Sequence, residues 1–266
     1  PAGAEPRLVG SRYCNHRPMT RHAALHLLAG VFAAVAVLYG AADMYYARAQ
    51  AAASIGLSGP LPLRDIVEQS LVELGPGRVA LVVADIAGKG IAAALLMANL
   101  QANLRARYGT TADDLPRLLQ PVNKLFFENT AENQYATLVI AEYDAGTRRM
   151  RYANCGHFPP ILLHPDGSSE HLMATATVLG LFEQWEVTTC ERALARGDLL
   201  VIYTDGMIEA MNRNGDEFGS ERLLETIKTN RALRAGELVT TLHAAVQTFS
   251  EGVLTDDLTV VVARAI

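Results

Sequence analysis

The chain has 266 residues, of which 50% are hydrophobic, so it can bury the core of a large folded domain. Its formal net charge is −5, and it has no Arg- and Lys-rich stripe with interleaved aromatic residues, which argues against a nucleic-acid partner. The three cysteines form neither a CxxC pair nor zinc-ligand spacing, so we expect reduced thiols in a cytosolic compartment.

The N-terminal part of the chain differs in character from the rest. Residues 1–22 are loop-like and poorly structured, and residues 23–48 are predicted as a hydrophobic helix. Within that helix, residues 23–42 are long enough to just span a bilayer. An Ala-rich buried or linker helix, or a secretory signal cleaved near Ala49, would fit the same pattern. Residues 49–64 contain several Gly and Pro residues and are predicted as a linker.

The arginines and the cysteines predict opposite sides of the membrane for the domain that follows this segment. Four arginines precede it, and the positive-inside rule would keep them in the cytoplasm and place the later domain outside. The unpaired cysteines favour a cytoplasmic domain instead. If Met19 starts the natural chain, Arg21 is the only arginine ahead of the helix. We therefore expect a cytoplasmic protein, anchored to the inner face of the membrane if residues 23–42 span it.

The most informative stretch begins with an apolar run at residues 79–84 that stops at one carboxylate, Asp85. The run is rich in β-branched residues and too short for a helix, so it predicts a core strand. Gly88 and Gly90 allow a tight turn after Asp85. Residues 91–107 are rich in Ala and Leu and lack Pro and Gly, which predicts a helix.

The same arrangement of a carboxylate at the end of an apolar run occurs twice more. Asp205 follows one run, and Asp256 and Asp257 precede another. A lone Asp at a strand end is often only a turn or cap residue. Three such ends, however, could bring their carboxylates together, and oxygen ligands suit hard cations such as Mg²⁺ or Mn²⁺. A bound cation would also explain why carboxylates that repel one another are gathered.

The other predicted elements indicate an α+β architecture of stacked sheets with helices outside. A second helix is predicted at residues 113–129, and two more at 220–229 and 235–250. Strands are predicted at residues 135–143, 150–153, 160–164, 186–191, 198–204 and 258–263, with turns at Pro165-Asp166-Gly167, Arg196-Gly197 and Asn214-Gly215.

Five segments of the chain resemble a known family in their order and spacing. They are DIAGKGIAAALLMA, YATLVIAEYD, RYANCGHFPP, GDLLVIYTDGMIEA and DDLTVVV. Together they resemble bacterial phosphatases of the sporulation stage II E (SpoIIE) type, a branch of the metal-dependent protein phosphatases (PPM, or protein phosphatase 2C-like). The resemblance covers residues 72–266, within a domain that we predict at residues 65–266. It implies a β-sandwich flanked by helices in α/β/β/α layers, behind an N-terminal helical or transmembrane extension.

The resemblance also implies the activity and the site. Members hydrolyse phosphoserine or phosphothreonine with two Mn²⁺ or Mg²⁺ ions, in many cases on a phosphorylated anti-sigma-factor antagonist. Carried onto this sequence, Asp85 would bridge both ions, with a neighbouring backbone carbonyl, that of Ile86, completing the shell. Asp205 and Asp256 would each hold one ion. Such a centre activates water directly, so no protein nucleophile is expected.

One departure from the family pattern affects the metal site. Members usually carry a Gly-Gly-Asp-x-x-Asp run on the preceding strand, and its two aspartates would fall here at Val67 and Ser70. Asp65 and Glu68 lie nearby but out of register. One ion is therefore expected to bind weakly or to be missing. The alternatives are a pseudophosphatase that binds phosphoproteins without turnover, and a membrane-tethered binding or sensor protein on a phosphatase scaffold.

His157 and Asp257 could each have a structural or a functional role. His157, in the family motif Asn154-Cys155-Gly156-His157, is expected to form structural hydrogen bonds in a turn, with catalysis as the alternative. Asp257 is expected to cap the turn before the last strand, with a role as an outer-shell metal ligand as the alternative. The Gly-Lys-Gly at residues 88–90 lacks the upstream glycine of a phosphate-binding Walker loop.

Overall fold

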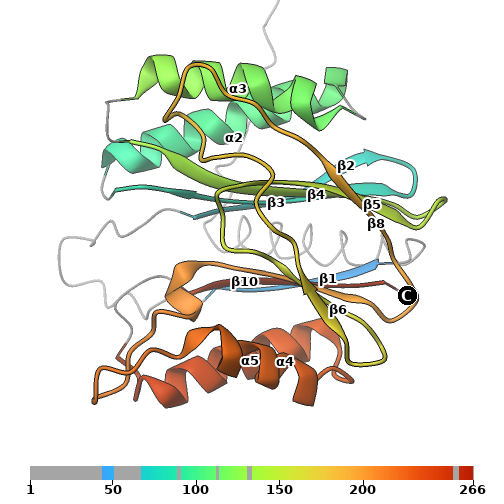
Figure 1. The fold of residues 1–266 in the computed structure, drawn as a ribbon, viewed down its shortest axis with the longest axis vertical. Helices are drawn as coiled ribbons and strands as arrows, with labels where there is room; N and C mark the ends of the chain where they lie inside the picture. Colours follow the sequence, from blue (N-terminus) through green and yellow to red (C-terminus); the bar gives the residue numbers. More distant parts are fainter. Residues whose placement is uncertain are drawn as a thin grey trace, which may run out of the picture. The chain divides into compact units, whose positions relative to one another are not determined.

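Two antiparallel five-stranded sheets face each other in the computed structural model, and a pair of helices covers the outer face of each (Figure 1). The structure describes residues 44–50, 67–88, 91–111, 114–130, 134–253 and 258–265. Among these residues, no helix is both long and apolar enough to cross a membrane. The predictions for residues 1–43 and 51–66, including the hydrophobic segment at 23–42, lie outside the described residues.

The first sheet has the strand order β2-β3-β4-β5-β8 and is antiparallel throughout. Its strands are β2 (Val67–Gly75), β3 (Arg78–Ile86), β4 (Ala136–Asp144), β5 (Arg149–Cys155) and β8 (Cys190–Ala193). Short turns join β2 to β3 and β4 to β5, so these neighbours in sequence are also neighbours in the sheet.

The second sheet has the order β1-β10-β9-β6-β7. Its strands are β1 (Met44–Gln50), β10 (Thr259–Ala265), β9 (Leu199–Tyr203), β6 (Ile161–Leu163) and β7 (Ser169–His171). The sequence does not predict β7, because Ser169–His171 contains no apolar residue and so lacks the alternating pattern of a strand. It forms as the second arm of a hairpin with β6, closed by the predicted turn at Asp166, whose Oδ1 accepts hydrogen bonds from Ser168.

Apolar side chains point alternately to the two faces of each strand, and together they form three hydrophobic layers. In β3, Val79, Leu81 and Val83 face the other sheet, while Ala80, Val82 and Ala84 face the helices. In β10, Val261 and Ala263 face the first sheet, while Val260 and Val262 face the opposite helix pair. Both faces of each sheet are therefore buried, which explains why these strands consist of continuous apolar runs.

The helices cover the sheets with one apolar face each. Helices α2 (Ile91–Thr111) and α3 (Leu115–Asn129) pack on the first sheet, and α4 (Gly219–Thr229) and α5 (Ala235–Phe249) on the second (Figure 1). In α2 the buried residues recur at helical spacing: Ala93, Met97, Leu100, Leu104 and Tyr108. The predicted α+β fold with α/β/β/α layers is confirmed.

Two segments differ from the sequence prediction. Residues 44–48 were assigned to the hydrophobic helix and 49–50 to the linker, but Met44–Gln50 form β1, which pairs with β10 along its whole length. The ladder with β10 outweighs the local helical pattern. The strand predicted at 186–191 begins only at Cys190, because Val187 instead packs on the core beneath α2 and α3.

Candidate active site

Asp85 lies near the end of β3, on the face of that strand that looks toward the other sheet. Its position continues the alternation of Val79, Leu81 and Val83, whose side chains form the layer between the sheets. Its side chain is partly exposed, and its Oδ1 atom is buried. The sequence therefore places one carboxylate at the rim of an otherwise apolar layer.

Asp205 belongs to the second sheet's side of the molecule and lies two residues after the end of β9. It begins a short 3₁₀ helix (η2, Asp205–Met207), and its Oδ1 accepts a hydrogen bond of 2.8 Å from the backbone N–H of Gly206. Thr204 fixes the strand end, because its N–H donates to the carbonyl of Thr259 at 3.1 Å and its Oγ1 accepts from the Thr259 N–H at 3.2 Å. Asp205 thus leaves the sheet beside the start of β10.

His157 links the two sheets at this same end. Asp85 and Thr137 are direct partners in the register of β3 and β4. The Thr137 Oγ1 lies 2.9 Å from His157 Nδ1, and His157 Nε2 lies 3.1 Å from the carbonyl oxygen of Tyr203, two residues before Asp205. Figure 1 agrees, since α2, which follows β3, starts on the same side as the short orange helix η2. The bridge holds the two aspartate-bearing strand ends at one edge of the sandwich.

The environment of His157 determines its protonation state and its tautomer. The side chain is buried, and desolvation lowers its pKa to about 4, although the bond to the Tyr203 carbonyl opposes that shift. The ring is therefore neutral at pH 7. Because a carbonyl can only accept, Nε2 carries the hydrogen and donates to Tyr203, and Nδ1 accepts from the Thr137 hydroxyl. The structural interpretation of His157 is confirmed.

Asn154 and Gly156 form the turn that presents His157. The buried Asn154 donates from its side-chain amide to the Leu172 carbonyl at 3.0 Å, and its Oδ1 accepts from the His157 N–H at 2.9 Å. Gly156 has φ of +68°, and a Cβ there would lie 2.6 Å from Cγ1 of Val178. The motif therefore combines a buried polar anchor with a glycine that no larger residue can replace without strain.

The strand before Asp85, β2, pairs with β3 in a defined antiparallel register. Val67 is the direct cross-strand partner of Asp85, whereas Glu68 is the partner of Ala84. Residues directly opposite in an antiparallel pair share a face of the sheet. Position 67 is thus the neighbour of Asp85 on β2, and in this chain it holds valine. Glu68 pairs instead with Ala84 and is not the register partner of Asp85.

The donor chemistry of this edge fits a hard divalent cation. Asp85 and Asp205 supply only oxygen atoms, and they end strands that His157 ties together. Ile86, whose carbonyl is a predicted ligand, is the last residue of β3. Asp256 and Asp257 lie outside the described residues. In the sequence they come just before Leu258 and Thr259, and Thr259, the first residue of β10, is hydrogen-bonded to Thr204. Within the described part of the chain, no three His, Cys, Asp or Glu side chains cluster as a metal site.

Thr137 and Thr204 were not identified from the sequence as parts of this edge. Both are threonines at the ends of otherwise apolar strands, and that contrast is the one signal that could have identified them. Their partners, however, are the ring of His157 and the backbone of Thr259, which are distant in sequence.

Comparison with known proteins places these features in context. The model of the family described as stage II sporulation protein E (SpoIIE) matches residues 75–266. The phosphoserine phosphatase RsbU of Bacillus subtilis is 26% identical over 194 residues, which cover 70% of this chain and 55% of that protein. The chain therefore spans little more than half the length of this curated relative.

Solved structures share the fold at low sequence identity. The phosphatase domain of SpoIIE from Bacillus subtilis, solved with a fragment of its regulatory domain, superposes with a TM-score of 0.68 at 23% identity, covering 83% of this chain and 63% of that one. The catalytic domain of the serine/threonine phosphatase PstP, solved with two manganese ions, has a TM-score of 0.58 at 18% identity, covering 83% of this chain and 97% of that one.

Proposed function

Because the chain belongs to the SpoIIE family of PPM-type phosphatases, we propose that it hydrolyses phosphoserine or phosphothreonine on a regulatory protein. The observation that carries the proposal is the His157 bridge, which holds the strand ends bearing Asp85 and Asp205 at one edge of the sandwich. A carboxylate-lined edge of this kind suits a phosphoryl substrate only when cations offset the negative charge of both partners.

We assign Asp85, the carbonyl of Ile86, Asp205 and Asp256 as the groups that would hold two Mn²⁺ or Mg²⁺ ions. Two bound divalent ions supply an activated water and charge neutralisation of the phosphoryl group. The protein contributes position: β3 and β9 hold Asp85 and Asp205, and the Gly206 N–H orients one oxygen of Asp205. Since His157 is buried and neutral with both ring nitrogens engaged, its role is to position the strand ends and not to transfer a proton.

The direct test uses Asp85→Asn and Asp205→Asn in hydrolysis of a phosphoserine peptide with Mn²⁺ added and then chelated. Each variant should lose activity by about a hundredfold or more, the scale seen when one transition-state contact is removed. Asp216→Asn is the matched control, because Asp216 is an exposed aspartate of the Asn214-Gly215 turn. Circular dichroism should show that all three variants are folded. Near-normal turnover by either site variant would refute the assignment.

A pseudophosphatase is the second candidate, and one observation favours it: valine stands directly opposite Asp85, where the family pattern has aspartate. In that case the edge would bind a phosphorylated partner with at most one ion and would not turn it over. Mn²⁺-dependent turnover of the phosphopeptide separates the two functions. Saturable phosphopeptide binding without any release of phosphate would favour the pseudophosphatase.

For the physiological partner, we propose a phosphorylated anti-sigma-factor antagonist. The support is membership of the family and the similarity to RsbU, a named phosphoserine phosphatase. Release of phosphate from such an antagonist, but not from an unrelated phosphoprotein of equal phosphate content, would test this choice of substrate.

We also propose that the domain acts in the cytoplasm, at the membrane if residues 23–42 span it. The support is the apolar length of that segment and the unpaired cysteines. The complete chain should then sediment with membranes and resist carbonate extraction, and its C-terminal domain should be protected from protease in intact spheroplasts. Digestion in spheroplasts would overturn the cytoplasmic orientation, and full solubility of the complete chain would exclude the anchor.

A further inference from the structure

A cavity of about 210 Å³ opens at the end of the second sheet where β6 and β10 finish and β9 begins. Four segments meet there: the turn after β6, the Arg196-Gly197 turn, the loop between α4 and α5, and the end of β10. The polar side chains of its lining are His164, Arg231 and Arg264, and the other side chains are apolar. Thr204, at the active-site edge, bonds to Thr259 at the opposite end of β10. The seven residues of β10 therefore separate the cavity from that edge by roughly 20 Å.

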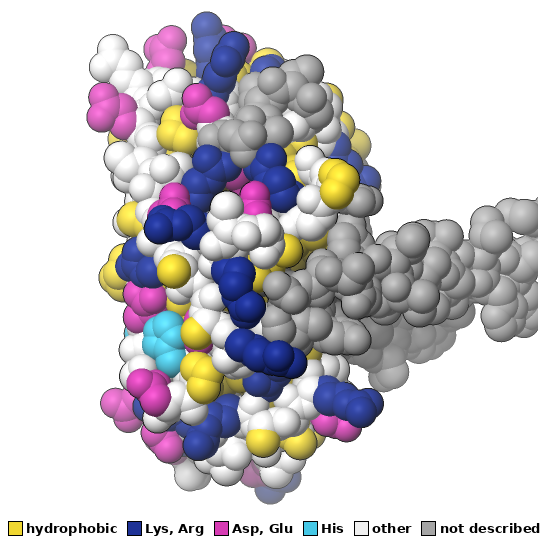
Figure 2. All heavy atoms as spheres, turned by 90° about the vertical axis from the view of Figure 1, so that its right-hand side faces the viewer, with side chains coloured by type: hydrophobic (Ala, Val, Ile, Leu, Met, Phe, Trp, Pro, Cys, Tyr) yellow, Lys and Arg dark blue, Asp and Glu magenta, His cyan; other side chains and the backbone are white. Residues whose placement is uncertain are grey.

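The charge of this cavity is not balanced by its own lining. Figure 2 shows many Lys and Arg side chains on the end face of the molecule. Nearby on the first sheet, a second cavity has three arginines in its lining, each paired with an acid: Arg78 with Asp144, Arg149 with Glu191 and Arg151 with Glu142. In contrast, no carboxylate lines the cavity at β10. Among the described residues, neither Arg231 nor Arg264 forms an ion pair with a carboxylate.

The basic groups are held in place by their neighbours. Arg264 donates to three backbone carbonyls: those of Gly197 at 3.3 Å, Arg231 at 2.5 Å and Leu233 at 2.8 Å. Burial lowers the pKa of its guanidinium. Gly197, with φ of +95°, forms the turn that supplies one of these carbonyls. These three hydrogen bonds hold the guanidinium group of Arg264 in place at the cavity, and the carbonyl dipoles offset only part of its charge.

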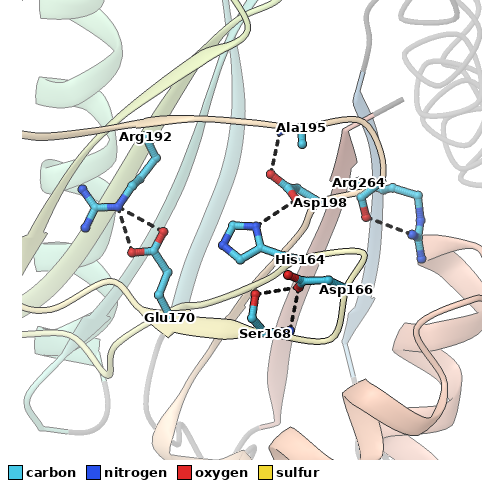
Figure 3. A network of polar contacts seen from close by, with 9 residues as sticks. His164, Asp166, Ser168, Glu170, Arg192, Ala195, Asp198 and Arg264 are labelled. Atoms are coloured by element: carbon cyan, nitrogen blue, oxygen red, sulfur yellow. Dashed lines mark hydrogen bonds and ion pairs between the residues drawn. The ribbon is translucent and has the colours of Figure 1, made fainter.

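His164 is fixed by a buried acid. Its Nδ1 lies 3.0 Å from Oδ1 of Asp198, whose Oδ2 accepts from the Ala195 N–H at 2.7 Å. Figure 3 shows the His164 ring turned toward the Asp198 carboxylate. With Nδ1 engaged, Nε2 is the ring nitrogen that can meet a ligand. Asp198 and the Asp166 of the adjacent turn both lie close to His164, so the positive charge of the cavity lining comes from Arg231 and Arg264.

We propose that this cavity binds a phosphate-sized oxyanion, either free phosphate or the phosphate group of a small monoester. Two guanidinium groups offer planar, directional N–H donors that match the oxygens of such an anion. Because His164 Nδ1 donates to Asp198, Nε2 can accept a hydrogen bond from a protonated phosphate oxygen. The cavity volume is ample for one phosphate group. The site is distinct from the carboxylate edge in position and opposite to it in charge.

The test is a titration of the complete, metal-free chain with inorganic phosphate at constant pH, followed by the imidazole resonances in NMR spectra. Removing metals by dialysis prevents phosphate from binding through cations at the other edge. The His164 resonances should shift in a saturable way, while those of His157 should not move. Repeating the titration with glycerol 3-phosphate distinguishes the two ligand sources, because a monoester site should bind it more tightly than free phosphate.

Arg231→Gln is the informative variant, since its exposed side chain makes one bond, to the Lys228 carbonyl, and its loss should not disturb the fold. It should weaken phosphate binding by about tenfold or more, the scale of one charge-assisted contact. Arg196→Gln removes an equal charge from the neighbouring turn without touching the cavity lining, and it should bind phosphate nearly as the wild type does. No saturable shift at His164, or equal weakening in both variants, would overturn the proposal.

Discussion

Val67 lies directly opposite Asp85 in the register of β2 and β3, at the rim of the layer between the two sheets. The resemblance to the family predicts a metal-binding aspartate at this position, where it would lie on β2 directly opposite Asp85. We therefore expect the missing carboxylate to weaken the proposed metal site.

Val67→Asp, with glycine at the two preceding positions, should raise Mn²⁺ affinity on the order of tenfold and increase turnover, because it adds a carboxylate beside Asp85. Calorimetry gives the affinity and the number of ions bound. Glu68→Gln is the control: Glu68 is the partner of Ala84, so its loss should leave Mn²⁺ binding unchanged. Unaltered Mn²⁺ affinity and stoichiometry in Val67→Asp, or lost binding in Glu68→Gln, would contradict this account.

Thr137→Val should lower the free energy of unfolding by about 1–3 kcal/mol, because it leaves the buried Nδ1 of His157 without its hydroxyl donor. Urea denaturation measures the change. Thr226→Val serves as the control, since its hydroxyl donates to the Arg222 carbonyl in an exposed hydrogen bond within α4 and should contribute no more than about 0.5 kcal/mol. Equal effects of the two substitutions would mean that the bridge between the sheets contributes little.

Stability should fall as the pH drops from 6.5 toward 4, in part because of His157. Its pKa is about 4 in the folded protein and near 6.5 when unfolded, so only the unfolded chain binds the proton in this window. The penalty is absent above pH 6.5 and complete below pH 4, where it reaches about 3 kcal/mol. His157→Gln should therefore lose less stability than the wild type between pH 7 and pH 5 in urea titrations. Parallel losses would argue against a buried neutral imidazole.

Gly156→Ala should destabilise the fold by more than about 2 kcal/mol, because it combines a positive φ with a clash against Val178. Gly167→Ala is matched in backbone conformation, with φ of +91°, but its new Cβ would meet open space. It should cost only about 1 kcal/mol of backbone strain. Thermal melts compare the two variants, and similar losses would show that the clash at Val178 is relieved by local movement.

The pattern of apolar residues along the chain by itself determined much of the fold. The run at Val79–Ala84 is apolar at every position, which only a strand buried on both faces explains, and it lies within β3. Helix α2 was predictable from its Ala- and Leu-rich composition, which lacks Pro and Gly over residues 91–107. The aspartates at strand ends, together with five motifs in order, identified the family and the candidate ligands.

Tertiary structure decided what depends on partners distant in sequence. Met44–Gln50 form a strand because they pair with β10, and Ser169–His171 form a strand because they pair with β6. The local sequence predicted neither strand. The neutral state of His157 follows from its burial between Thr137 and Tyr203, which lie on different sheets. The cavity around Arg264 joins four segments that no local pattern connects. Hydrophobic periodicity is a property of neighbours along the chain, whereas desolvation and charge balance depend on which residues the fold brings together.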